Sequence, residues 1–131
     1  MVITEKMNNR IRELADEYGL NVVVLFGSQA TGKIHSKSDV DIAVISRKPV
    51  ERIKLVSEFS DLLRRDDVEV VNLVNASPTL MRSVVADGKL LYEAEEGAFL
   101  RWKIYAIKIW METAWLRKLR DKKLVEWAAR S

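Results

Sequence analysis

Two short stretches of the chain have the residue types and the spacing needed for phosphate and metal chemistry. Gly27 and Ser28 follow an apolar run, and Asp39 and Asp41 stand two residues apart at the start of the next one. Glycine lets a chain turn without a Cβ clash, so a Gly-Ser turn can present backbone N–H groups and a hydroxyl to a phosphate. Aspartates at i and i+2 of a strand share one face, so their carboxylates can converge on a metal ion.

Asp41 is hard to explain by structure alone, because the run from Val40 to Ile45 is otherwise apolar. A buried, unpaired carboxylate costs several kcal/mol unless a cation or hydrogen bonds compensate for its charge. Oxygen-only ligands suit Mg²⁺, which keeps several waters and is completed by substrate phosphates. Each half of the pattern alone is common at turns and strand starts, but the two together predict a site for Mg²⁺ and a phosphate-bearing substrate.

Strands are needed to hold these residues, and the apolar runs predict them. Three runs rich in β-branched residues have strand length, and a short fourth run is suited to an edge strand. The predicted strands are 20–26, 39–45, 68–74 and 89–92.

Helices are predicted where apolar residues recur every three or four positions. The first covers residues 3–18, and Gly19 is suited to end it. A second lies between the second and third strands. Another begins at Ser77 and Pro78, an N-cap followed by a first-turn proline. From Ala94 onward the pattern predicts one long helix or two joined helices.

Composition limits the chemistry that is available. The chain has 131 residues, of which 48% are hydrophobic and 31% charged, as expected for one folded domain. It has no cysteine, which excludes disulfides, thiolate nucleophiles and zinc–sulfur sites, and its single histidine, His35, excludes a histidine ligand cluster. No apolar run is long enough to span a membrane, and the first residues lack a signal core, so we expect a cytoplasmic protein.

The pattern Gly-Ser, ten residues, Asp-x-Asp after a hydrophobic strand resembles the signature of the polymerase-β-type nucleotidyltransferase superfamily. The short chain, with its LFGS and SDVDIAV segments, is similar to the minimal nucleotidyltransferases, antitoxins that are commonly paired with a HEPN-domain RNase toxin. The resemblance covers residues 1–93. It implies an α+β fold in which a small mixed sheet is flanked by helices, with the residues from 94 to 131 as a long C-terminal helical extension.

The resemblance also implies roles for the site residues. Gly27 and Ser28 would hold the β- and γ-phosphates of a nucleoside triphosphate. Asp39 and Asp41 would bind two Mg²⁺ ions, which would activate the attacking hydroxyl and stabilise the pyrophosphate leaving group.

The resemblance further implies a third metal-binding carboxylate on the following strand. Glu69 matches that position, and Asp67, on the same strand face, is the alternative. The family usually has aspartate there, and many members carry a basic residue just after Gly-Ser, where this chain has none. Lys33 or Lys37 would then supply the positive charge for the phosphates.

The activity that the resemblance implies is transfer of AMP from ATP to a protein hydroxyl, on a tyrosine of a cognate HEPN toxin, which silences the toxin. Two alternatives stay open. The chain could be an antitoxin that only binds and occludes its toxin, or a nucleotidyltransferase that acts on a small molecule or an RNA end.

The last segment differs in composition from the rest of the chain. Residues 1–93 carry 13 Lys and Arg against 14 Asp and Glu, whereas residues 94–131 carry 9 against 5. Six of the ten aromatic residues lie in this last segment: Phe99, Trp102, Tyr105, Trp110, Trp115 and Trp127.

One helical stripe of this segment is expected to cover the sheet: Leu100, Ile104, Ile107, Met111 and Ala114. Trp110 and other apolar residues would then lie on other sides, and a helix that is apolar on more than one side is covered on more than one side. The segment therefore predicts a partner interface and a possible hetero-oligomer. Acidic residues among its cations favour an acidic protein surface over nucleic acid as the partner.

Overall fold

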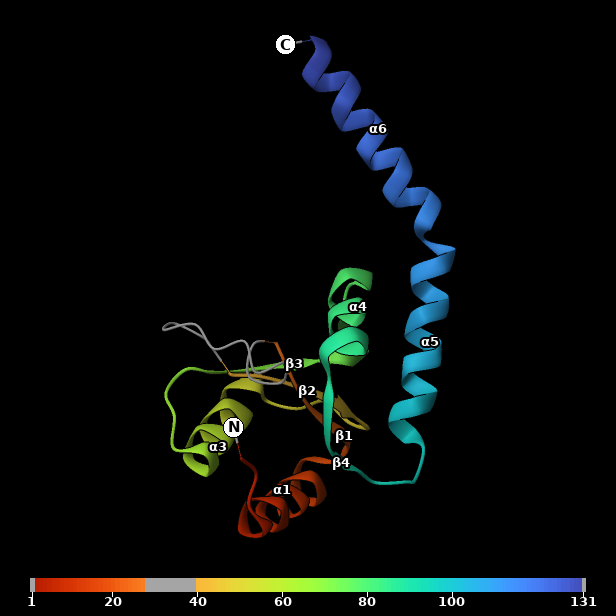
Figure 1. Cartoon of the computed structure of the whole chain (residues 1–131). Helices are drawn as coiled ribbons and strands as arrows, with labels where there is room; N and C mark the ends of the chain where they lie inside the picture. The colour runs from red at the N-terminus through yellow and green to blue at the C-terminus, as the bar shows by residue number, and fades with distance from the viewer. Residues whose placement is uncertain (1, 28–39, 131) are drawn as a thin grey trace.

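The computed structural model describes residues 2–27 and 40–130. In chain order the elements are α1 (Glu5–Tyr18), β1 (Leu20–Phe26), β2 (Val40–Ser46), α3 (Arg52–Leu63), β3 (Val68–Asn72), the 3₁₀ turn η1 (Leu73–Asn75), α4 (Pro78–Asp87), β4 (Lys89–Glu93), α5 (Ala98–Glu112) and α6 (Ala114–Arg130). Figure 1 shows the first part of the chain as a layered body, from which α6 projects.

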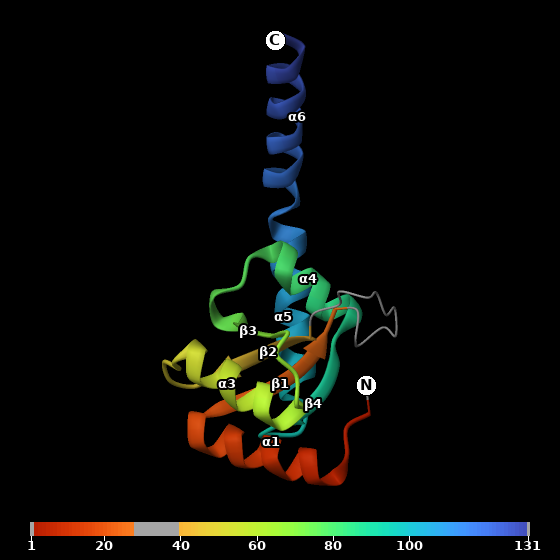
Figure 2. The same cartoon turned by 90° about the vertical axis from the view of Figure 1, so that its left-hand side faces the viewer.

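The four strands form one mixed sheet in the order β3-β2-β1-β4. β1 is antiparallel to both β2 and β4, whereas β2 and β3 are parallel. Helices α1 and α3 pack on one face of the sheet, and α4 and α5 pack on the other (Figures 1 and 2). The predicted small mixed sheet flanked by helices is confirmed.

β1 is buried on both faces from Val22 to Phe26, which explains why these five residues are all apolar. Val23 and Leu25 belong to the core cluster beneath α1 and α3. Val22, Val24 and Phe26 belong to the cluster beneath α4 and α5. Alternation along a strand sends successive side chains to opposite faces, so a strand between two helical layers needs apolar residues at every position.

The helix ends predicted at Gly19 and Ser77 are confirmed, and the start of α1 is capped by Thr4, a cap that is not among the predicted ones. α1 begins at Thr4, whose Oγ1 accepts a hydrogen bond from the N–H of Met7 at 3.2 Å, and ends at Gly19 in the left-handed conformation. α4 begins at Ser77, whose Oγ accepts from the N–H of Leu80 at 3.2 Å, with Pro78 in the first turn.

The third strand is shorter than predicted, because it ends at Asn72. The Asn72 side chain donates to Ser46 Oγ at 2.7 Å and accepts from the N–H of Val74 at 3.2 Å. This local hydrogen bond turns the chain into η1, an alternative that asparagine offers to continued strand pairing.

The C-terminal segment forms two joined helices that meet at Thr113. Thr113 Oγ1 donates to the carbonyl of Ile109 at 2.8 Å, and the guanidinium of Arg117 lies 3.4 Å from the centre of the Trp110 ring and donates to the Trp110 carbonyl at 2.8 Å. Trp110, expected on a free side of the helix, is half-buried and also lies 5.0 Å from Arg82 of α4.

The predicted covering face of this segment is wrong. Leu100, Ile104, Ile107 and Met111 are 47–69% exposed. Phe99 and Ala106 are buried in their place, and the ring of Trp102 stacks on Phe99 with 6.0 Å between centroids. Both stripes have helical spacing, and the one with aromatic rings buries more apolar area per residue.

Glu93 fixes the start of α5 and provides a pH-dependent test of the fold. Its carboxylate accepts hydrogen bonds from the N–H groups of Phe99 at 3.0 Å and Gly97 at 3.1 Å, and these bonds hold the pKa of Glu93 below its ordinary value of 4.5. A carboxyl group whose pKa is lowered by folding stabilises the folded state at pH values above its ordinary pKa. This stability is lost as the pH falls through the folded-state pKa.

We expect Glu93→Gln to lower the urea midpoint at pH 7, with the difference from wild type shrinking below pH 4.5. An equal difference at all pH values would contradict this role.

Within residues 2–27 and 40–130, the chain forms no helix with the length and apolar character that crossing a bilayer requires.

Candidate active site

Asp41 and Glu69 are neighbours on adjacent strands. Asp41 of β2 pairs in register with Glu69 of β3, in the parallel part of the sheet. Register partners on parallel strands point to the same side, and neighbouring strands lie about 4.8 Å apart. The two carboxylates therefore share one face at the start of both strands. Asp41 is half-buried and Glu69 is exposed.

This face is the one covered by α4 and α5. Asp41 is the register partner of Phe26 at the end of β1, and Phe26 and Ala43 belong to the cluster beneath those helices. Val40 and Ile42, on either side of Asp41, are buried in the opposite core. The alternation explains how a carboxylate fits in an apolar strand: it lies at the end of the sheet, on the face where the covering helices leave it half-exposed.

The backbone at Gly27 passes close to the Asp41 carboxylate. Gly27 has φ +78°, and a Cβ at this position would lie 2.5 Å from Asp41 Oδ2. Glycine is required here both for the left-handed conformation and for the close approach. The turn after β1 therefore lies directly against the Asp41 carboxylate.

Asp67, the alternative third carboxylate, is bound by an arginine. Nε of Arg65 donates to Oδ1 at 2.7 Å, and Nη2 donates to Oδ2 at 2.6 Å. The hydrogen bonds from Arg65 hold the pKa of the Asp67 carboxyl below its ordinary value. Glu69 is thus the carboxylate in register with Asp41, and Asp67 is held in an ion pair.

Ser28, Lys33, Lys37 and Asp39 lie outside the described residues. In the part of the chain that is described, no three His, Asp or Glu side chains are grouped closely enough to hold a metal ion. The Asp41–Glu69 pair supplies only oxygen ligands, the donor chemistry that suits Mg²⁺. Asp41 and Glu69 therefore fit part of a magnesium site, and Asp39 is the predicted further ligand.

The family follows from a comparison with known proteins. Residues 9–97 match the family described as Polymerase beta, Nucleotidyltransferase, over more than half of the chain. The chain belongs to this nucleotidyltransferase family. The resemblance seen in the sequence is confirmed, and the matched segment contains Gly27, Asp41 and Glu69.

Two relatives of the nucleotidyltransferase are named Protein adenylyltransferase MntA. The one from Shewanella oneidensis is 35% identical over 80 residues, which cover 59% of this chain and 57% of that protein. The one from Aphanizomenon flos-aquae is 27% identical over 117 residues, covering 80% of this chain and 76% of that protein. The match to the Shewanella protein therefore spans little more than half of its length.

Solved structures with the same fold come from toxin–antitoxin complexes. A toxin–antitoxin structure with AMP-PNP gives a TM-score of 0.74 at 28% identity, over 90% of this chain and 98% of that chain. The tri-AMPylated Shewanella oneidensis HEPN toxin in complex with MNT antitoxin gives 0.70 at 25% identity, over 92% and 98%. The α+β nucleotidyltransferase fold is confirmed.

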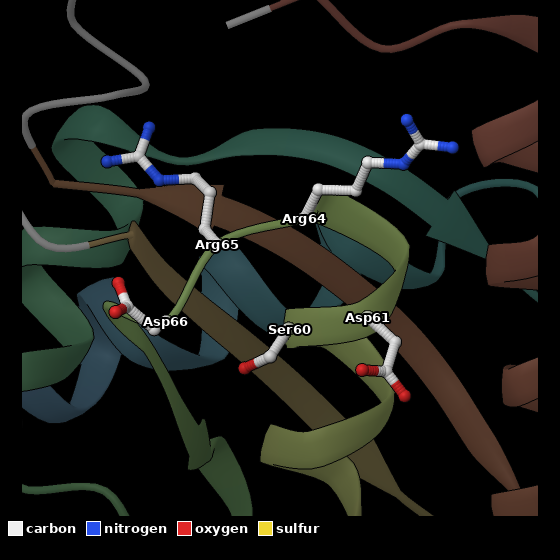
Figure 3. A pocket seen from close by; sticks show the side chains of 5 residues that line it. All are labelled: Ser60, Asp61, Arg64, Arg65 and Asp66. Carbon is white, nitrogen blue, oxygen red and sulfur yellow. The ribbon is translucent and has the colours of Figure 1, made fainter.

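A hollow with charged walls lies beside the ion pair of this nucleotidyltransferase. It has a volume of about 780 Å³ and is lined by Ser60, Asp61, Arg64, Arg65 and Asp66. Figure 3 shows both guanidinium groups directed to one side of the end of α3, away from the other three side chains.

No pattern in the sequence singles out Arg65. Its only signal is a basic residue two positions before Asp67 at a predicted strand start, which is a common arrangement in solvated turns. The ion pair depends on the conformation at the end of α3. The sequence does not predict that conformation, because the left-handed residue at the helix end is Arg64 and not a glycine.

Proposed function

We propose that this protein transfers AMP from ATP to a tyrosine hydroxyl of a cognate HEPN RNase toxin and acts as its antitoxin. The observation that carries the proposal is the in-register pair Asp41 and Glu69 beside the Gly27 turn, in a chain of the nucleotidyltransferase family. Two relatives named protein adenylyltransferase, and similar structures with AMP-PNP and with a tri-AMPylated HEPN toxin, support the choice of nucleotide and acceptor.

In this reaction the tyrosine oxygen bonds to the α-phosphorus of ATP. The bond from that phosphorus to the bridging oxygen of the β-phosphate breaks, pyrophosphate leaves, and the hydroxyl proton is released. Gly27, Ser28 and Lys33 bind the leaving phosphates, and the carboxylates of Asp39, Asp41 and Glu69 bind two Mg²⁺ ions. When bound, the ions supply positive charge that stabilises the attacking and leaving oxygens.

The two parts of the chain have separate tasks in this proposal. Residues 1–93 form the nucleotidyltransferase domain, and residues 94–131 extend it as the toxin interface, in the cytoplasm. Supporting this, none of the side chains described in α6 is buried, and Trp115 and Trp127 are 62% and 70% exposed. The cations of α6 fit an acidic toxin surface: Arg117, Lys118, Arg120, Lys122, Lys123 and Arg130.

Loss of the two exposed tryptophans of α6 tests the interface. We expect Trp115→Ala combined with Trp127→Ala to weaken toxin binding about 30-fold, because aromatic anchors supply much of the binding energy at interfaces. The affinity for ATP should stay unchanged, since both side chains belong to α6, which projects from the layered body (Figure 2). Calorimetry with purified toxin and, separately, with nucleotide measures both.

Ile53→Ala is the matched control, because Ile53 is a 77% exposed apolar residue on α3, away from α6. It should bind toxin as wild type does. Equal losses in both variants would show only a general effect of removing exposed apolar area, and unchanged binding by the double tryptophan variant would contradict the interface.

The proposed activity is tested by intact mass of the toxin after incubation with this protein, ATP and Mg²⁺. We expect a gain of one or more AMP masses, together with loss of toxin RNase activity, and neither change when ATP is omitted. Toxin inhibition without ATP and without any gain in mass would instead support the antitoxin that acts by binding alone.

A further inference from the structure

We infer that Arg65 is a positioning residue for nucleotidyl transfer: by holding Asp67 in an ion pair, it leaves Glu69 as the carboxylate that works beside Asp41. The inference rests on the proposed function, since it assigns a role within the same site. It names a residue that does not touch substrate and acts through another side chain.

The backbone places Asp67 at the edge of the candidate site. The N–H of Val40 donates to the carbonyl of Asp67 at 2.9 Å, so pairing between β2 and β3 extends one residue before Val68. Asp67 stands two residues before Glu69 and thus falls on the same strand face. A freed Asp67 carboxylate would lie on the same face as the Asp41–Glu69 pair, two residues or about 6.6 Å along the strand from Glu69.

Both oxygens of that carboxylate are bound by Arg65. The contacts of Nε and Nη2 measure 2.7 and 2.6 Å, and the two side chains are only 33% and 28% exposed. Such a two-point contact fixes orientation as well as charge. Partial shielding from water makes this pair stronger than an ordinary surface ion pair.

The end of α3 sets the position of Arg65. Arg64 has φ +54°, and the N–H groups of Arg64 and Arg65 both donate to the carbonyl of Ser60. A left-handed residue other than glycine carries strain, and Arg64 is the only non-glycine residue with a positive φ within the described residues. This strained turn brings the arginine side chain beside Asp67.

The charges predict opposite effects for the two members of the pair. Arg65→Ala leaves one extra negative charge beside the metal ligands, so metal binding should become about tenfold tighter. Asp67→Asn leaves an extra positive charge and should weaken it by a similar factor. The double variant restores the net charge and should bind metal as wild type does. A merely structural ion pair would weaken metal binding in all three.

The rate of AMP transfer should not follow the order of metal affinity among the variants. Arg65→Ala should transfer AMP about tenfold more slowly at saturating Mg²⁺ despite its tighter metal binding, because Asp67 can then compete as a ligand and displace the metal from its productive position. The double variant should recover the wild-type rate, since asparagine cannot supply that carboxylate.

The experiment measures Mn²⁺ binding to all four proteins in the presence of AMP-PNP by calorimetry, the rate of toxin AMPylation, and thermal unfolding. Tighter binding with slower transfer in Arg65→Ala, and recovery of both in the double variant, supports the inference. Weaker binding in Arg65→Ala, or no recovery in the double variant, overturns it. Metal binding that follows the predicted order without any toxin AMPylation by wild type would overturn the proposed function alone.

Discussion

Asp41→Asn is expected to lower the rate of AMP transfer about a thousandfold while the fold stays intact. Asparagine keeps the size of the side chain but removes the negative charge that binds the metal in the proposed function. Loss of a metal ligand removes several kcal/mol of charge stabilisation in the transition state, and each 1.36 kcal/mol corresponds to about a tenfold change in rate. The initial rate of toxin AMPylation, followed by intact mass, measures the effect.

Asp16→Asn is the matched control for this substitution. Asp16 is an exposed carboxylate on α1, which packs on the opposite face of the sheet from Asp41. The control should transfer AMP at the wild-type rate. Thermal unfolding of Asp41→Asn should match wild type or rise slightly, because the neighbouring Glu69 then loses a like charge. An Asp41→Asn protein with near wild-type transfer would contradict the assigned role.

Gly27→Ala is expected to slow AMP transfer on the order of a hundredfold. A methyl group at this position would lie 2.5 Å from Asp41 Oδ2, so either the carboxylate or the turn must move. Displacing a reacting group by about 1 Å can cost on the order of 10²-fold in rate. The left-handed backbone adds about 1–2 kcal/mol of strain to the folded state. Transfer rate and urea unfolding together measure both effects.

Gly19→Ala separates backbone strain from the effect on the site. Gly19 has φ +68°, close to that of Gly27, but its added methyl group would meet only the flexible side chain of Lys48 at 3.1–3.4 Å. We expect a similar loss of stability and an unchanged transfer rate. If both alanine variants slowed transfer equally, the close approach of Gly27 to Asp41 would have no special role.

Much of the fold could be predicted because local signals and packing agree. The predicted range of β1 matches the observed one, because its residues from Val22 to Phe26, which helices cover on both faces, are all apolar. The end of α1 and the start of α4 could be predicted because Gly19 supplies a left-handed conformation and Ser77 a hydrogen bond, both of which act within a few residues.

Features that depend on distant contacts could not be predicted. Leu100 and Phe99 both lie on stripes with helical spacing, and only the neighbouring α4 and sheet decide which stripe is buried. β3 ends early because the Asn72 side chain accepts from the N–H of Val74, in an orientation in which it also donates to Ser46, 26 residues away in the sequence. Sequence periodicity contains no information on either choice.

The candidate site divides in the same way. The role of Asp41 could be predicted from the sequence, because a carboxylate in an apolar strand needs a cation or hydrogen bonds to compensate for its charge. The register that pairs Asp41 with Glu69 could not be predicted from their spacing, since two parallel strands can pair in more than one register with the same sequences. The close approach of Gly27 and the ion pair of Arg65 with Asp67 likewise required the folded arrangement.

A crystal structure of the protein with Mn²⁺ and AMP-PNP tests the central claim most directly. The anomalous signal of manganese locates the metal independently of the protein atoms. We predict a manganese ion within coordination distance of both Asp41 and Glu69, with the triphosphate against the Gly27 turn. Nucleotide bound elsewhere, or a metal that contacts neither carboxylate, would contradict the account.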